Sequence, residues 1–318
     1  MPLSEKRLIS RIRNSVVQDR RVITGIGDDC AVLRLSPGHE ALLTTDFSIE
    51  GVHFRRDWQP AEVIGWRCLT RGLSDIAAMG GTPIAAFLSL ALPARTPQGW
   101  VDQFFDGLLA LATKMKVTLA GGDTGESPSR VLADIIVLGS VPAGRAVRRS
   151  TASVGDVIYV TGRLGGAAAT LELLLRGKKA TPRNFPEYFR PLPRVAVGKH
   201  LRERRWATSM IDISDGLSTD LGHICEEGGV GAEIHADAIP RAQIGRTATI
   251  VCMEHALHGG DDYELLFTVS PKTQLPRVIA GVPITRIGEI IRGERVLIID
   301  SDGRRRNLKP GGWQHFSR

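Results

Sequence analysis

The sequence lacks any apolar run long enough to cross a lipid bilayer. Its longest apolar stretch extends from Ile84 to Pro93, whereas a transmembrane helix needs about 20 consecutive apolar residues. The N-terminus has charges but lacks the apolar segment and the small-residue cleavage site of a secretory signal. We therefore expect a cytoplasmic protein with no membrane span.

Cysteines and aromatic residues are scarce. The four cysteines lie far apart, with no CxxC spacing and no nearby histidine in the register of a zinc site, which favours reduced structural thiols. Phe, Trp and Tyr make up 5% of the residues, and the basic residues behind the net charge of +7 are spread along the chain. Both features argue against a nucleic-acid-binding surface. A basic protein that handles small anions explains the charge equally well.

The short motifs of two common phosphoryl-transfer folds are also missing. The sequence contains no GxxxxGK[ST] pattern, and no kinase-type glycine-rich loop with matching HRD and DFG motifs. Both the P-loop and the protein-kinase architectures are therefore disfavoured, and phosphoryl transfer would need another scaffold.

Length and pattern predict two domains in tandem. A chain of 318 residues exceeds one ordinary domain. A passage rich in Gly, Pro and Arg interrupts the pattern at 142–155, so we expect an N-terminal domain over 1–141, a linker over 142–155 and a C-terminal domain over 156–318. Helices are expected at 61–79, 99–116, 165–176 and 193–204, with apolar strands between and after them. The expected fold class is α+β.

Several aspartates stand beside Gly, Ser or Thr where we expect apolar strands to end. They are Asp28, Asp29, Asp46, Asp75, Asp123, Asp212 and Asp215. A single aspartate of this kind is usually a turn or cap residue. A set of them fits Mg²⁺, which prefers oxygen ligands and in ATP enzymes binds carboxylates together with phosphate oxygens. Because crowded carboxylates would destabilise the fold without cations, the pattern predicts several Mg²⁺ ions around a triphosphate.

Six motifs follow one another along the chain: GIGDDCAVL, TTDFSIEGVHF, LSDIAAMGGTP, GGDT, IDISDGLSTDLGHI and GGDDYELLFTV. Their order is the one found in thiamine-monophosphate kinases. The sequence resembles that family over nearly its whole length, and through it the larger group of aminoimidazole-ribotide-synthetase-like ATP enzymes. The resemblance implies a two-domain fold. The N-terminal domain has a mixed sheet with helices, and its strands pair across a homodimer; the C-terminal domain is an αβ sandwich.

The same resemblance implies a role for each matching position. Metal binding is implied for Asp29, Thr44, Thr45, Asp46, Asp75, Asp123, Asp212 and Asp215, with Asp28 as an auxiliary ligand and Asp46, Asp75 and Asp212 as the catalytic set. Contacts with ATP are implied for Gly122, Asp123, Arg145 and Ser214, and contacts with thiamine monophosphate for His53, Asp261 and Trp313. A carboxylate and an aromatic face would both stabilise the cationic thiazolium ring.

Simpler interpretations exist for three of these residues, and two positions depart from the family pattern. Trp313 could be a packing residue, His53 a surface or core histidine, and Arg145 a solvated cation. Gly125 and Glu126 follow GGDT where a basic residue is usual, so a phosphate contact from that loop is doubtful. Asp261 replaces the more common Glu, which keeps the charge but shortens the side chain by one methylene.

The resemblance implies the reaction of ATP with thiamine monophosphate to give ADP and thiamine diphosphate. We expect direct in-line attack without a phosphoenzyme, because a phosphate monoester is mostly ionised near neutral pH and needs no strong base. One alternative is an ATP enzyme of the same group that acts on selenide or a purine-pathway intermediate. The other is a nucleic-acid-binding or regulatory protein, whose binding would depend strongly on salt and would survive loss of the aspartates.

Overall fold

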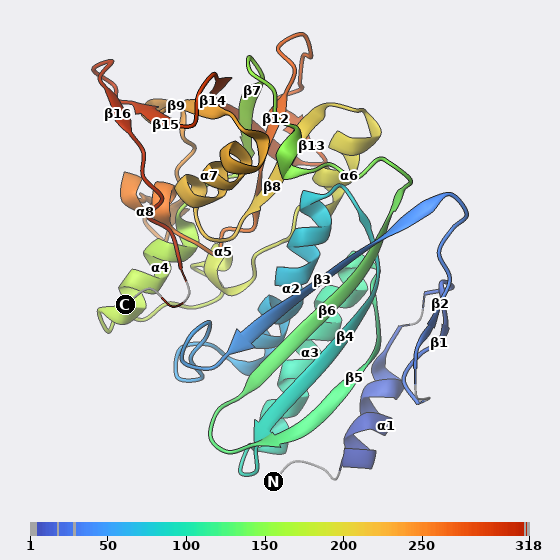
Figure 1. Ribbon diagram of the computed structural model, residues 1–318. Coiled ribbons are helices and arrows are strands. Elements are labelled where there is room, and N and C mark those ends of the chain that lie inside the picture. Colours follow the sequence, from blue (N-terminus) through green and yellow to red (C-terminus); the bar gives the residue numbers. More distant parts are fainter. Residues whose placement is uncertain (1–4, 18, 28–29, 315, 317–318) are drawn as a thin grey trace. The chain divides into compact units, whose positions relative to one another are not determined.

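The chain folds into two compact units, each built on a mixed sheet (Figure 1). The computed structural model describes residues 5–17, 19–27, 30–314 and 316. The first unit comprises residues 1–76 and 81–144, and the second comprises residues 77–80 and 145–318. The predicted α+β class is confirmed in both. Among the described residues, no helix combines the length and the apolarity that crossing a bilayer requires.

The first unit centres on a four-stranded sheet with the strand order β3-β6-β4-β5. Its strands are β3 (His39–Ile49), β4 (Thr82–Pro93), β5 (Thr118–Ser127) and β6 (Leu132–Pro142), with a small antiparallel pair β1 (Val22–Thr24) and β2 (Val32–Leu33); its helices are α1 (Glu5–Ser15), α2 (Ala61–Ala78) and α3 (Gln98–Met115). β4 and β5 are parallel and joined through α3, whereas β6 pairs antiparallel with β3 and β4. Helices α2 and α3 lie on one face of the sheet (Figure 1).

Helices α2 and α3 cross where a glycine of each meets the backbone of the other. A Cβ atom added to Gly65 would lie 1.9 Å from the carbonyl oxygen of Phe104, and one added to Gly107 would lie 1.7 Å from that of Glu62. Backbones can approach this closely only where no side chain intervenes. The two glycines therefore fix the distance between the helices that cover the sheet.

The second unit centres on an eight-stranded sheet with the order β16-β15-β9-β14-β7-β12-β8, in which β13 also pairs with β14. Its strands are β7 (Val157–Thr161), β8 (Ala207–Ile213), β9 (Gly231–His235), β12 (Glu264–Val269), β13 (Val278–Ile279), β14 (Val282–Ile291), β15 (Val296–Ile299) and β16 (Arg305–Asn307). Its α-helices are α4 (Gly166–Leu175), α5 (Pro186–Phe189), α6 (Val195–Glu203), α7 (Leu217–Gly228) and α8 (Met253–His258), and a further strand pair is β10 (Gln243–Ile244) with β11 (Thr249–Ile250). β9 and β15 run parallel, and the other neighbours in the sheet run antiparallel.

Both faces of the second sheet are covered, as β12 shows. Leu266 belongs to a core that includes residues of α7 and α8. Its neighbours Leu265 and Phe267 belong to a separate core that includes Val197 and Leu201 of α6. Successive residues of a strand point to opposite faces, so a continuous apolar run is what a strand buried on both sides requires. This arrangement agrees with the expected αβ sandwich.

The close crossing of α2 and α3 can be tested with two glycines of the same helix. We expect Gly107→Ala to lower the free energy of unfolding by about 2 kcal/mol, because the added methyl group meets backbone that cannot rotate away. Gly99→Ala is the matched control, since nothing lies within 4 Å of its added Cβ. That change should be neutral or stabilising by up to about 1 kcal/mol. Urea unfolding measures both, and equal effects would contradict the crossing.

Candidate functional site

Thr44, Asp46 and Asp75 gather on the helix-covered side of the first sheet. Thr44 and Asp46 share one face of β3, because side chains alternate along a strand. Gly72 of α2 faces the methyl group of Thr44, which identifies that face as the one under α2. The Thr44 hydroxyl donates a short hydrogen bond to Oδ2 of Asp75, in the last turn of α2. Three oxygen-bearing side chains that were expected to bind metal therefore share this side of the sheet.

Thr45 points to the opposite face of the same strand. Its hydroxyl donates a hydrogen bond of 2.7 Å to Oδ1 of Asp134 on β6. The structure therefore separates the Thr45 side chain from those of Thr44 and Asp46, although the resemblance grouped all of them as metal ligands. Sequence analysis did not single out Asp134. Asp134 could have been recognised in the sequence because it is the one acidic residue in the otherwise apolar strand LADIIVLGSVP.

The expectation that the aspartates stand at strand ends was wrong for three of them. Asp46 lies inside β3, Asp75 lies in α2, and Asp123 lies inside β5. β5 continues through the GGDT motif because its pairing with β4 extends to Ser127. Moreover, β5 and β3 are opposite edges of the sheet, three strand spacings or about 14 Å apart. The first unit by itself does not bring Asp123 to Asp46 and Asp75.

Gly122 and Asp123 instead line a cavity of about 520 Å³ within the first unit. Phe87 of β4 and Phe105 of α3 contribute apolar walls. Gly122 has φ 143°, and a Cβ there would lie 1.9 Å from the carbonyl oxygen of Leu88, so the position requires glycine. The volume is in the range of about 300–1,000 Å³ that is typical of small-molecule sites. Sequence analysis missed the apolar walls because they come from elements far apart in the chain.

His53 lies in the turn that follows β3. Its Nδ1 accepts the N–H of Ile49 at 3.0 Å, so in the neutral ring the proton is on Nε2. The residue is half-buried and therefore not a simple surface histidine. The two remaining acidic residues expected in this unit, Asp28 and Asp29, lie outside the described residues.

In the second unit, main-chain hydrogen bonds bring four predicted site residues together. Ser214 and Asp215 directly follow β8. The carbonyl oxygen of Ser214 accepts the N–H of Asp261 at 2.8 Å, and that of Asp215 accepts the N–H of Trp313 at 3.1 Å. The Trp313 side chain is 51% exposed, which does not fit a simple packing residue. Residues expected to contact ATP, metal and substrate thus meet at the end of β8.

The stretch that carries Asp261 has an unfavourable backbone. Asp261 has φ 66° and Tyr263 has φ 52°, a region that costs non-glycine residues about 1–2 kcal/mol each. The buried Tyr263 offsets this cost, because its hydroxyl donates to Oδ1 of Asp261 at 2.6 Å and its N–H donates to the carbonyl oxygen of Ile213 at 2.9 Å. Strain of this kind is typical of ligand-binding segments.

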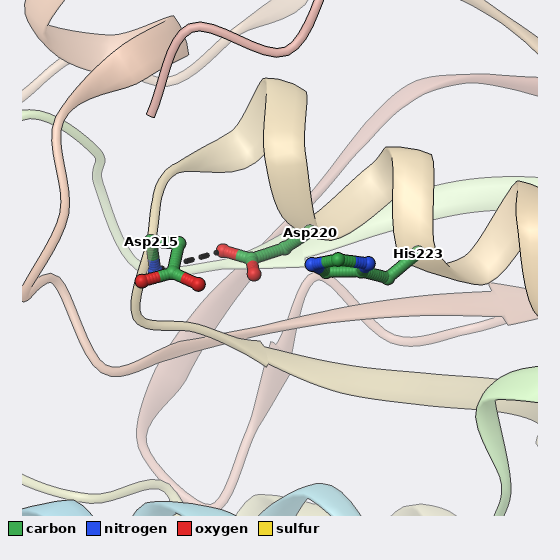
Figure 2. A group of neighbouring side chains, drawn as sticks. All are labelled: Asp215, Asp220 and His223. Atoms are coloured by element: carbon green, nitrogen blue, oxygen red, sulfur yellow. Dashed lines mark hydrogen bonds between the residues drawn. The ribbon is translucent and has the colours of Figure 1, made fainter. Parts of the chain in front are cut away.

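Asp220 and His223 of α7 lie close to Asp215 and were not identified from the sequence. One ligand atom of each of the three residues lies within 4.8 Å of the others (Figure 2). Asp220 Oδ2 accepts the N–H groups of Asp215 at 3.2 Å and of Gly216 at 3.0 Å. Asp220 and His223 stand three residues apart on a helix, which places them on one face. This three-residue spacing could have indicated from the sequence alone that Asp220 and His223 lie on the same face of a helix.

Negative charge is crowded around Asp220. Burial and the nearby carboxylates of Asp212 and Asp215 raise the pKa of Asp220 to about 8. Asp212 itself is only 2% exposed. A cation would relieve this repulsion, and a set dominated by carboxylate oxygens suits a hard cation such as Mg²⁺. The residues present therefore fit the expected metal.

Arg145 lies close to a second guanidinium group in the second unit. Burial and the positive charge of Arg145 lower the pKa of Arg202. Arg202 is anchored by its Nε, which donates to the carbonyl oxygen of Gly80 at 2.7 Å. The carboxylate of Glu203 lies 3.4 Å from Arg202 and offsets part of the repulsion between the two guanidinium groups. A phosphate bound beside the pair would offset more of it. Arg202 was not singled out from the sequence.

Comparison with known families defines the class of this protein. Residues 27–141 match the family described as AIR synthase related protein, N-terminal domain, and residues 153–300 match AIR synthase related protein, C-terminal domain. The crystal structure of the hydrogenase maturation protein HypE in complex with ATP has a TM-score of 0.78 at 18% identity, which shows the common fold alone. The two mixed-sheet units are thus those of an AIR synthase related protein.

Closer relatives narrow this class. The thiamine-monophosphate kinase of Salmonella typhimurium is 38% identical over 322 residues, covering 98% of this chain and 96% of the relative. The thiamine-monophosphate kinase structure from Stenotrophomonas maltophilia has a TM-score of 0.80 at 37% identity and covers 96% of this chain and 98% of that one. The structure of AaThiL complexed with AMPPCP and TMP has a TM-score of 0.77 at 32% identity over 99% of each chain. The chain therefore belongs to the thiamine-monophosphate kinase family, as its motifs indicated.

Asp262, next to Asp261, is a buried carboxyl group whose raised pKa should make the free energy of unfolding depend on pH. Its Oδ2 accepts the N–H of Gly165, at the start of α4, at 2.7 Å. Desolvation raises the pKa of Asp262 well above its usual value, and the charges of Glu264 and Asp261 raise it further. The folded chain therefore holds this proton more tightly than the unfolded chain. The resulting stability is present below the unfolded pKa of about 4 and is lost as the pH rises through the folded value.

We therefore expect the stability of Asp262→Asn to depend less on pH than that of the wild type. The wild-type free energy of unfolding should fall relative to the variant's by up to about 1.4 kcal/mol per pH unit above pH 4. Urea unfolding at several pH values measures this difference. Asp237→Asn is the control, because Asp237 is exposed and its profile should parallel the wild type. A parallel profile for Asp262→Asn would contradict the expectation.

Proposed function

We infer that this chain transfers the γ-phosphoryl group of ATP to thiamine monophosphate, giving ADP and thiamine diphosphate. The observation that carries the inference is 38% identity over 98% of the chain to a thiamine-monophosphate kinase. The likeness to AaThiL complexed with AMPPCP and TMP supports both substrates, since AMPPCP is an analogue of ATP. The reaction is one of thiamine diphosphate biosynthesis, and the cytoplasm remains its predicted location.

Mg²⁺ is the proposed metal, held by carboxylates in both units. Asp46, Asp75 and Asp123 would contribute from the first unit, and Asp212 and Asp215 from the second. Asp29 and Thr44 complete the proposed set, together with the main-chain carbonyl oxygen of Thr45, because the Thr45 hydroxyl points to the other face of β3. When bound, Mg²⁺ supplies positive charge against the triphosphate. The crowding of carboxylates supports this proposal, because burial and the charges of Asp212 and Asp215 raise the pKa of Asp220 to about 8, and a cation would offset that repulsion.

For the nucleotide, the first unit offers the glycine-lined cavity. The backbone at Gly122 can approach a phosphate closely, while the apolar walls of the same cavity suit the flat adenine ring. Arg145, supported by Arg202, would add charge on the phosphates, and Ser214 would contribute a further contact.

The substrate would be held by His53, Asp261 and Trp313. Asp261 and Trp313 are joined to consecutive residues by main-chain hydrogen bonds, so a carboxylate and an aromatic ring are available to one cationic thiazolium group. The ionised phosphate of the substrate would attack the γ-phosphorus in line, without a phosphoenzyme. The work of the protein is then positioning and charge neutralisation.

Activity assays with matched aspartate variants test this function. Purified protein with ATP, Mg²⁺ and thiamine monophosphate should form thiamine diphosphate, whereas free thiamine should give no product. Asp46→Asn, Asp75→Asn and Asp212→Asn should each lower kcat by about 100-fold or more, since each removes charge that positions the reacting phosphates. Asp106→Asn, on the exposed side of α3, is the control and should keep wild-type turnover. Near-normal activity of all three site variants at saturating Mg²⁺ would refute the metal proposal.

A homodimer formed through the first sheet is the proposed assembly. β3 is an edge strand, and its outer face exposes Leu43 by 71% and Phe47 by 55%. An exposed edge with large apolar side chains is unfavourable in a monomer and is normally covered. A second copy of the chain would cover it on both partners at once through an isologous contact.

We expect Leu43→Glu combined with Phe47→Glu to convert the dimer to a monomer, because two buried charges would oppose the contact. Sedimentation velocity at micromolar concentration measures the assembly state. Leu175→Glu is the matched control, since Leu175 is 65% exposed on α4 in the second unit and should leave the dimer intact. A dimer that persists in the double variant would rule out this face.

A further inference from the structure

Cys252, His255 and Glu172 form a hydrogen-bonded series in the second unit, separate from the residues proposed for catalysis. Cys252 Sγ lies 3.2 Å from His255 Nδ1, and His255 Nε2 lies 2.7 Å from Glu172 Oε2. Cys252 immediately precedes α8, His255 lies in α8, and Glu172 belongs to α4. No histidine was expected in the register of a zinc site near a cysteine. That expectation did not consider the three-residue spacing of Cys252 and His255 as a possible contact.

Glu172 determines which nitrogen of His255 carries the proton. A carboxylate only accepts hydrogen bonds, so Nε2 must donate, and Nδ1 of the neutral ring is left as an acceptor. The thiol of Cys252 is therefore the donor to Nδ1. Glu172 is itself held by the guanidinium group of Arg176 through its other oxygen. A nucleophile, a base and a group that orients the base thus stand in sequence, which is the arrangement of an activated thiol.

The surroundings leave this thiol accessible. Cys252 is exposed, as is Cys30, whereas Cys68 and Cys225 are buried. Burial raises the pKa of both buried thiols to about 12, which keeps them protonated and unreactive. Three charged groups lie close by: Arg176 contacts Glu172, Arg241 donates to the carbonyl oxygen of Val251 at 3.1 Å, and Glu254 lies 3.5 Å from His258. Burial suits the structural role expected for Cys68 and Cys225, whereas Cys30 and Cys252 are both open to solvent.

We propose that Cys252 is a reactive thiol that hydroperoxides oxidise to a sulfenic acid. His255 accepts the thiol proton, and the thiolate sulfur attacks one oxygen of the peroxide. The S–O bond forms as the O–O bond breaks, and the departing hydroxide takes the proton from the imidazolium ring to leave as water. Sulfur is oxidised by two electrons and the peroxide is reduced by two. With hydrogen peroxide the products are the sulfenic acid of Cys252 and one water molecule.

The first test measures how fast each cysteine of the full-length protein reacts with iodoacetamide at pH 7, using peptide mass spectrometry. An isolated thiol is only a few per cent ionised at this pH. Transfer of its proton to a neighbouring imidazole increases the ionised fraction, although the resulting thiolate is a weaker nucleophile. The net gain in the rate of alkylation is about 10-fold. We expect Cys252 to react about 10-fold faster than Cys30 in the same molecules. Equal rates for the two exposed cysteines would overturn the proposal.

Variants assign the activation to the series. His255→Gln should slow the labelling of Cys252 by about 10-fold and Glu172→Gln by a smaller factor, with Cys30 unchanged. Glu254→Gln is the matched control, because it removes a neighbouring carboxylate that faces His258, and it should leave the rate as in the wild type. Glu172→Gln also keeps the test decisive if His255→Gln fails to fold, since Glu172 lies on the surface of α4. A wild-type rate in Glu172→Gln and in a folded His255→Gln would refute the role of the series.

Peroxide oxidation is then followed directly. Wild-type protein treated with hydrogen peroxide and then with dimedone should carry the dimedone adduct at Cys252, and Cys252→Ser should carry none at that position. Labelling confined to Cys30 would overturn the proposal.

Discussion

The repulsion among closely placed carboxylates is the constraint on which the second unit depends. Asp220 holds the turn after β8 by accepting two main-chain N–H groups, yet it stands beside Asp212 and Asp215 and its pKa is raised to about 8. The turn after β8 therefore holds three carboxyl groups close together. A bound cation, as proposed above, would offset the repulsion among these groups.

Glycine makes the rest of this arrangement possible. A Cβ on Gly312 would lie 2.1 Å from the carbonyl oxygen of Asp215, and one on Gly260 would lie 2.6 Å from that of Ser214. These positions allow the segments that carry Asp261 and Trp313 to reach the turn after β8. Gly122 does the same in the first unit, where it lets β5 approach Leu88. Glycines that look like flexible loop residues in the sequence are thus sites of close backbone packing.

Sequence patterns predicted some features well and others poorly. The 99–116 segment was recognised as a helix because its apolar residues recur every three or four positions, and α3 occupies Gln98–Met115. The GGDT motif was taken for the end of a strand because glycine and aspartate are usual in turns. Pairing with β4 overrides that preference and keeps Asp123 inside β5. Asp220 and His223 were within a recognised motif but were not assigned, since their closeness to Asp215 depends on how the turn after β8 leads into α7.

The sequence by itself determined the family, the α+β class and the order of the acidic motifs, because these follow from local composition and from periodicity along the chain. Only the tertiary structure decided which of the candidate residues lie close together. Strand alternation separated Thr45 from Thr44, and strand order placed Asp123 at the opposite edge of the sheet from Asp46. Contacts between α4 and α8 joined Cys252, His255 and Glu172. Such groupings depend on the pairing of distant segments, and local sequence does not encode that pairing.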